Sequence, residues 1–158
     1  MATNLRKWLS IAVALAGACA LGVSVQAGHW WAYESFFIGP TGTEICSGGD
    51  CHPGSLMQIG GSEHWTRTGV AVWAGGLLTL LLLVIIASAT AAGRKPRMLS
   101  KTAIVSVVAT GLAGAWFYAS FPGMAGADFA PARGLYLFAA GLVAGAVGAA
   151  MIWRRARR

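Results

Sequence analysis

Charged residues are scarce in this 158-residue chain, and acidic residues are the scarcest of them. Asp, Glu, Lys and Arg together make up 11% of the sequence, whereas a soluble domain carries about 25%. Only 5 residues are acidic, against 12 Lys and Arg, while 56% are hydrophobic. So few charges would leave a free monomer poorly soluble, which excludes an ordinary soluble globular domain.

Four long apolar stretches contain no Asp, Glu, Lys or Arg at all. They cover residues 8–27, 69–92, 102–121 and 134–153, and each is close to the roughly 20 residues that a helix needs to cross a bilayer. We therefore predict an all-α membrane fold, in which residues 1–158 form one up-down bundle of four transmembrane helices within the lipid bilayer. The stretches also lack the embedded acid or base on which ion-coupled transporters and most intramembrane enzymes depend, so we expect no enzyme and no cofactor.

The charged residues outside these stretches separate by sign. Ten of the 12 basic residues lie before the first stretch, between the second and third, or after the fourth: Arg6, Lys7, Arg94, Lys95, Arg97, Lys101, Arg154, Arg155, Arg157 and Arg158. The positive-inside rule places these segments, and with them both termini, in the cytoplasm. The other side carries all the acids: Glu34, Glu44, Asp50, Glu63 and Asp128. Membrane orientation and headgroup contact account for the basic runs, and we expect no nucleic-acid partner.

The N-terminal stretch also has features of a secretory signal peptide. Arg6 and Lys7 precede an apolar run that ends at Val25-Gln26-Ala27, and cleavage there or before Cys19 would leave three spans. We expect a retained helix, because the apolar run is long and uniform. The abundance of Ala, Gly and Arg is typical of a GC-rich bacterial genome, so we expect the bacterial inner (plasma) membrane.

Residues 28–68 form the larger of two predicted outer loops. They contain all three His and two of the three Cys. Turns are predicted at Gly39-Pro40, Gly48-Gly49, Pro53-Gly54 and Gly60-Gly61. Residues 30–38 and 41–46 are compatible with strands, so we predict a small antiparallel sheet in this loop. The second outer loop, residues 122–133, contains Pro122, Gly123, Gly126 and Pro131 and is predicted to be a simple connection.

Aromatic and glycine residues are expected to serve the membrane-embedded bundle. Aromatic side chains near helix ends favour the headgroup level, and we expect this for Trp8, Trp30, Trp31, Trp65, Trp73, Trp116, Tyr118, Tyr136 and Trp153. Small residues let membrane helices approach closely, and the fourth stretch contains a G-x-x-x-G pair. The predicted packing residues are Gly111, Gly114, Gly141, Gly145 and Gly148. We favour packing inside the bundle over contact with another protein.

The segment from Cys46 to His52 is the strongest candidate for a chemical role. Two nearby thiols in an oxidising compartment normally pair, so we predict a Cys46–Cys51 disulfide across a hairpin that turns at residues 47–50. A redox-active pair is an alternative, although only Cys19 remains as a relay thiol. Covalent c-type haem is another, since His52 directly follows the second cysteine.

The three histidines are weak candidates for a metal site. His29, His52 and His64 all lie in or near the first outer loop, and imidazoles bind zinc or copper. Their spacing matches no familiar metal motif. We therefore favour surface or capping roles and predict no metal.

The order of these features resembles the claudin/PMP22-like tetraspan membrane protein superfamily. Members have four helices, inner termini, a larger first outer loop and a W…G-L-W…C…C signature in that loop. Trp30 or Trp31 takes the place of the first Trp, Gly39 lies where the G-L-W segment would, and Cys46, Cys51 and Arg67 follow in comparable order. The chain departs from the pattern because no Trp follows Gly39, only four residues separate the cysteines, and the second loop is short.

The resemblance implies a function without catalysis. The first loop would be a small sheet stapled by the disulfide, and the protein would act by lateral assembly, adhesion or accessory binding to another membrane protein. The acids of the loop would favour cations or basic partners. The alternative is a small membrane redox or electron-transfer subunit that uses Cys46, Cys51 and His52.

Overall fold

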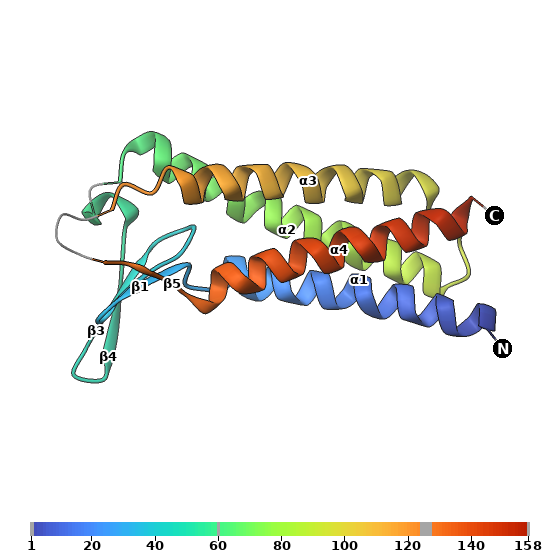
Figure 1. The fold of residues 1–158 in the computed structure, drawn as a ribbon, viewed down its shortest axis with the longest axis horizontal. Helices are drawn as coiled ribbons and strands as arrows, with labels where there is room; N and C mark the ends of the chain where they lie inside the picture. Colours follow the sequence, from blue (N-terminus) through green and yellow to red (C-terminus); the bar gives the residue numbers. More distant parts are fainter. Residues whose placement is uncertain (1, 60, 124–127, 158) are drawn as a thin grey trace.

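The computed structural model describes residues 2–59, 61–123 and 128–157 and confirms a four-helix bundle with a small sheet at one end (Figure 1). The helices are α1 (Ala2–Gln26), α2 (Glu63–Ala91), α3 (Arg97–Ala119) and α4 (Arg133–Ala156). All four are long and apolar enough to cross a membrane. Consecutive helices pack together and α4 returns to α1, while both termini lie at the end opposite the sheet (Figure 1). Gly60, Gly126 and Arg158 lie outside the described residues.

The helices extend beyond the apolar stretches that predicted them. α1 begins at Ala2 rather than residue 8, α3 at Arg97 rather than residue 102, and α4 ends at Ala156 rather than residue 153. Polar residues continue a helix past the hydrocarbon core, so the loss of hydropathy does not mark the end of the helix.

The start of α2 shows the local cause of such an extension. Ser62 caps the helix, and its hydroxyl oxygen accepts a hydrogen bond of 3.1 Å from the backbone N–H of Trp65. Glu63 adds an acidic residue to the first turn, where the helix dipole favours negative charge. The first outer loop therefore ends at Ser62 and not at residue 68 as predicted.

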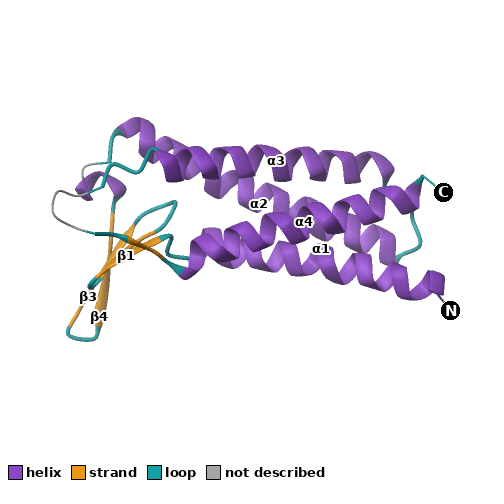
Figure 2. Ribbon diagram, viewed as in Figure 1, coloured by secondary structure: helices purple, strands orange, loops and turns teal. Residues whose placement is uncertain are grey.

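An antiparallel sheet lies at one end of the bundle and projects to one side of it (Figure 2). Its strands are β1 (Trp31–Tyr33), β2 (Phe36–Ile38), β3 (Thr43–Ser47), β4 (Asp50–Gly54) and β5 (Ala130–Pro131), in the spatial order β4-β3-β2-β1-β5. A short 3-10 helix, η1 (Leu56–Ile59), leads from β4 toward α2. The prediction of an antiparallel sheet is confirmed.

Two details of the sheet differ from the prediction. The run at residues 30–38 is a hairpin and not one strand, because Glu34 adopts a positive φ of 49° and reverses the chain between β1 and β2. The second outer loop is not a simple connection, because β5 pairs with β1 through Trp31 and Ala32. Both outer segments therefore build one sheet.

The predicted turn at Gly48-Gly49 is present between β3 and β4. Both glycines have positive φ, 64° and 97°, and they separate the register partners Ser47 and Asp50. A two-residue hairpin loop that matches the twist of its strands calls for positive φ at both positions, which glycine adopts without a Cβ clash.

Small residues bring α1 and α4 into close contact. A Cβ on Gly148 would lie 2.6 Å from backbone atoms of Ala14 in α1, and a Cβ on Gly17 would overlap the backbone of Gly145. Gly145 and Gly148 are buried. The G-x-x-x-G face of α4 is therefore covered by α1 within the bundle.

The remaining glycines of the predicted packing set also lie at helix contacts. Gly141 is buried against Leu21 of α1, and Gly114 of α3 is covered by the ring of Phe138. Gly111 is half-buried near Leu142 of α4.

Candidate functional site

An aromatic cluster joins the sheet to the helices, and we call it the aromatic junction. Its side chains come from β1 and the residue before it, from α2, α3 and α4 near their ends on this side, and from the second outer segment. Each ring lies within 6.2 Å, centroid to centroid, of another member. The members are Trp30, Trp31, Tyr33, Trp65, Phe117, Tyr118, Phe121, Phe129 and Phe138.

Trp30 is the most deeply placed member. Its side chain is fully buried, and its ring centroid lies 4.6 Å from that of Phe138 and 5.6 Å from that of Phe117. The indole N–H donates to the hydroxyl of Ser24 at 3.3 Å, and that hydroxyl donates to the carbonyl of Gly134 at 2.7 Å. One polar bridge thus connects the end of α1, the first outer segment and the start of α4.

Trp31 and Trp65 attach the sheet to the other two helices. Trp31 stacks on Phe121 at 4.4 Å and on Tyr118 at 5.5 Å. Trp65 stacks on Phe117 at 4.7 Å, and its indole N–H donates to the Phe117 carbonyl at 3.0 Å. The indole of Trp65 thus has a partner for its single polar group, as a buried tryptophan requires.

The headgroup role predicted for these three tryptophans is therefore wrong. Trp30, Trp31 and Trp65 are at most 3% exposed, whereas Trp8 and Trp116 are 58% and 60% exposed. The five share proximity to helix ends, but only the fold separates the buried rings from those at the surface.

Backbone hydrogen bonds hold the base of the sheet to α4. The N–H of Ala132 donates to the carbonyl of Trp30 at 2.9 Å, and the N–H of Gly134 donates to the carbonyl of His29 at 2.8 Å. Trp30 in turn donates its own N–H to Ile38 of β2 at 2.6 Å. The position of the sheet relative to the bundle is thus set by main-chain contacts as well as by packing.

The Gly39-Pro40 turn predicted from the sequence packs on α2. Pro40 is buried, and a Cβ on Gly69 of α2 would overlap the Pro40 carbonyl oxygen. Arg67 is exposed and pairs with Glu63 one turn earlier in the same helix. Of these residues of the loop signature, Gly39 therefore belongs to the base of the sheet, whereas Arg67 lies on the helix surface.

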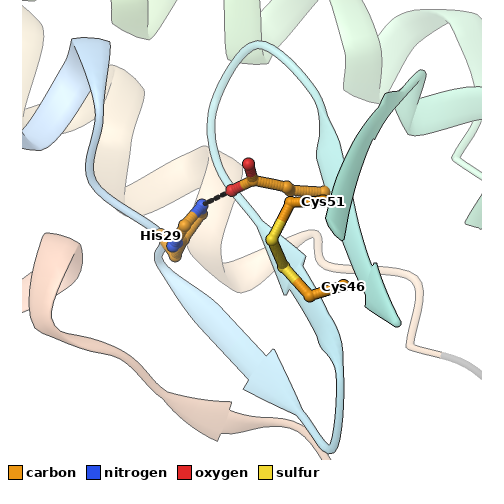
Figure 3. Close-up of a disulfide and its surroundings, with 4 residues drawn as sticks. His29, Cys46 and Cys51 are labelled. Carbon is orange, nitrogen blue, oxygen red and sulfur yellow. Dashed lines mark ion pairs between the residues drawn. A yellow bond between two sulfur atoms is a disulfide. The ribbon is translucent and has the colours of Figure 1, made fainter. Parts of the chain in front are cut away.

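The predicted disulfide joins Cys46 and Cys51 at opposing positions of β3 and β4 (Figure 3). On the same side of the sheet, His29 contacts the carboxylate of Glu44, with 2.8 Å between Nε2 and Oε2, and its ring lies 4.9 Å from that of Phe37. One face of the sheet therefore carries both the disulfide and the His29–Glu44 pair.

The other face of the sheet carries a row of larger side chains. Tyr33, Phe36, Ile45 and His52 are register partners across β1, β2, β3 and β4, so they lie side by side on one face. The first three are half-buried and His52 is exposed. We call this set the cross-strand row.

The three histidines do not converge on one point. His29 is engaged by Glu44, His52 belongs to the cross-strand row, and His64 is exposed in the first turn of α2. Among the described residues, no three His, Cys, Asp or Glu side chains are placed to hold a metal ion.

The outer tip of the sheet is negatively charged. Residues 31–54 include Glu34, Glu44 and Asp50 and no Lys or Arg. Glu44 pairs with His29, while Glu34 and Asp50 are exposed at the two tight turns. The exposed part of this tip therefore carries negative charge with no Lys or Arg in residues 31–54 to balance it.

A hydroxyl cluster inside the bundle was not predicted. Thr79 of α2 hydrogen-bonds to Ser106 at 2.7 Å and to Thr110 at 3.0 Å, both in α3. Three hydroxyl residues within apolar stretches were the available signal, but their partnership depends on how the helices face each other. Such bonds connect membrane helices, and the cluster serves the α2–α3 contact.

The geometry therefore favours presentation of a surface. The aromatic junction fixes the base of the sheet, and the disulfide links its outer hairpin. The acidic tip is exposed, and the cross-strand row is partly exposed. A comparison with protein-family models and with curated proteins finds no match for this chain.

Proposed function

We propose that this chain is a non-enzymatic, claudin-like membrane protein that assembles with a second copy or with another membrane protein through its sheet. The observation that carries the proposal is a sheet that projects past the helices (Figure 2) and is fixed at its base by the aromatic junction. Its acidic tip is exposed, and its cross-strand row is partly exposed. A preorganised surface lowers the entropy lost on binding.

The claudin-like assignment is supported by the arrangement of elements. The longer of the two outer segments supplies four strands and a disulfide within a four-helix bundle, as the resemblance implies. Trp30 closes the base of that sheet, and Gly39 lies in its packed turn. The missing Trp after Gly39 leaves the signature incomplete.

We further propose that both termini are cytoplasmic and that the membrane is the bacterial inner membrane. The concentration of Arg and Lys at the end with the termini supports this orientation. A reactive thiol placed at Ser47 would then be labelled by an impermeant reagent in intact cells, and one at Arg94 would not. If only the Arg94→Cys variant were labelled, the orientation of the protein in the membrane would be the opposite of the one proposed.

The contact surface in this proposal is the sheet, since the glycines of α4 are covered by α1. A photo-crosslinking amino acid at Ser47, beside the outer turn, tests this in native membranes. The matched control carries the same amino acid at Leu112, which is 69% exposed on α3. Both positions are accessible, but only the first belongs to the proposed contact.

Crosslinked species from Ser47 with few from Leu112 would support assembly through the sheet. Products from Leu112 alone would move the contact to the helices. No products from either position would reject assembly. The mass of the products distinguishes a second copy from another membrane protein.

A further inference from the structure

A cavity opens at the end of the bundle that carries both termini. Its volume is about 680 Å³, and it lies between the start of α1, the connection from α2 to α3 and the last turns of α4. It is separated from the sheet by the length of the helices (Figure 1). The cavity is therefore independent of the contact surface proposed above.

Basic residues from three separate segments converge on this cavity. None of the described residues that line it is acidic. The five acidic residues of the chain lie in the sheet or near the sheet end of the bundle, away from the cavity. Each segment contributes two: Arg6, Lys7, Arg94, Lys95, Arg154 and Arg155. The described lining of the cavity thus combines several basic side chains with no acidic one.

The inner surface of the cavity combines donors with an apolar wall. Lys7 donates from Nζ to the carbonyl of Ala91 at 3.0 Å, which holds its ammonium across the α1–α2 gap. An ammonium has three donors, so two remain for a ligand. Leu9, Met151 and Ile152 provide the apolar part of the lining. A ligand with an anionic head and an apolar portion satisfies both parts.

The depth of the cavity matches the membrane interface. Trp8 is exposed at this end of α1, and Trp153 of α4 lies under the guanidinium of Arg157, 4.0 Å from its ring centroid. Tryptophans at the ends of spans lie at headgroup level. A lipid headgroup reaches this depth without leaving the bilayer.

We propose that this cavity binds the phosphate-bearing headgroup of an anionic phospholipid. Basic pockets between transmembrane helices bind such headgroups, and each Lys or Arg near an anionic surface contributes on the order of 1 kcal/mol. Free phosphate shares the chemistry of the headgroup but would leave the apolar wall uncovered. The lipid is therefore the assigned occupant.

The test uses the full-length protein in detergent and measures lipid binding by native mass spectrometry. The probes are phosphatidylglycerol and phosphatidylcholine with the same acyl chains. The variant R94Q/K95Q removes two cavity charges. Its control, R97Q/K101Q, removes two charges from the same end of the protein, at exposed residues outside the cavity lining. A thermal unfolding curve for each variant shows that it is folded.

We expect phosphatidylglycerol to bind and R94Q/K95Q to weaken it about tenfold or more. R97Q/K101Q should bind within about twofold of the parent protein, because neither exposed side chain lines the cavity and each adds only a solvent-weakened attraction to the headgroup. Phosphatidylcholine should bind the parent protein no more strongly than it binds R94Q/K95Q.

Three results would overturn the proposal. Equal loss in both variants would show general attraction to the basic end and no defined site. Equal binding of the two lipids would remove the role of net negative charge. Displacement of phosphatidylglycerol by millimolar inorganic phosphate would assign the cavity to the free anion.

Discussion

At the sheet end of the bundle, stacked rings and hydrogen bonds connect every helix, whereas at the other end six basic side chains surround a cavity. At the first end, the polar groups of Ser24, Trp30 and Trp65 are paired inside the protein. The second has a surplus of donors and no described acid in its cavity lining.

This difference indicates a division of roles along the bundle axis. Paired polar groups and packed rings favour one conformation, which suits a surface that must keep its shape. Like charges around a cavity repel each other until an anion arrives, which suits a site that gains stability from its ligand. The predictions below test this contrast.

Trp30→Ala is expected to have the largest effect. It removes a fully buried indole from the aromatic junction and should lower the free energy of unfolding by about 3–5 kcal/mol. Trp116→Ala is the control, since that ring is 60% exposed near the same end of α3. Denaturant unfolding in detergent measures both. Similar losses would mean that the sheet end is no more tightly packed than the lipid-facing surface.

Removal of the disulfide should have a moderate effect. Cys46→Ser with Cys51→Ser opens a short loop and should cost about 2 kcal/mol. Hydrogen exchange should rise in β3 and β4, while the helices remain protected. A folded protein with unchanged exchange but lost electron transfer in membranes would instead favour the redox alternative.

The variants Ser24→Ala and Ser10→Ala compare a hydroxyl that bridges two segments with one that bonds within its own helix. Ser24→Ala should cost about 1–2 kcal/mol, because the indole N–H of Trp30 loses its acceptor in a buried site. Ser10→Ala should cost much less, since that hydroxyl bonds only to the carbonyl of Lys7 in its own helix. Thermal unfolding of the two variants gives the comparison. Equal shifts would contradict the division between the ends.

Neutralising charge at the cavity should have the smallest effect and the opposite sign. Without anionic lipid, R94Q/K95Q should raise stability by less than about 1 kcal/mol, because two repelling charges are lost. High salt should remove the gain by screening. A loss of stability in low salt would show that these side chains hold the bundle together.

The features predicted correctly from the sequence are those that depend on short segments. The four spans follow from uninterrupted apolar stretches, and the Gly48-Gly49 turn and the disulfide follow from residues close together in the chain. Each span is one continuous apolar stretch, and the residues of the turn and the disulfide lie close together in the sequence.

The features that were missed depend on contacts between distant segments. β5 consists of Ala130 and Pro131, which gives no strand signal until β1 is placed beside it. The burial of Trp30 depends on Phe138, far along the chain. The basic residues were predicted to orient the chain, but their convergence on one cavity depends on the packing of α1, α2 and α4.

Because β5 is synthesised late, the sheet can be completed only near the end of membrane insertion. The outer edge of β1 finds its partner only in residues 130–131, which are synthesised after the first three helices. An unpaired strand edge invites aberrant pairing, so a nascent chain that stalls before residue 130 exposes one. Completion of the sheet would then report that α3 has crossed the bilayer and that residues 130–131 have reached the side away from both termini.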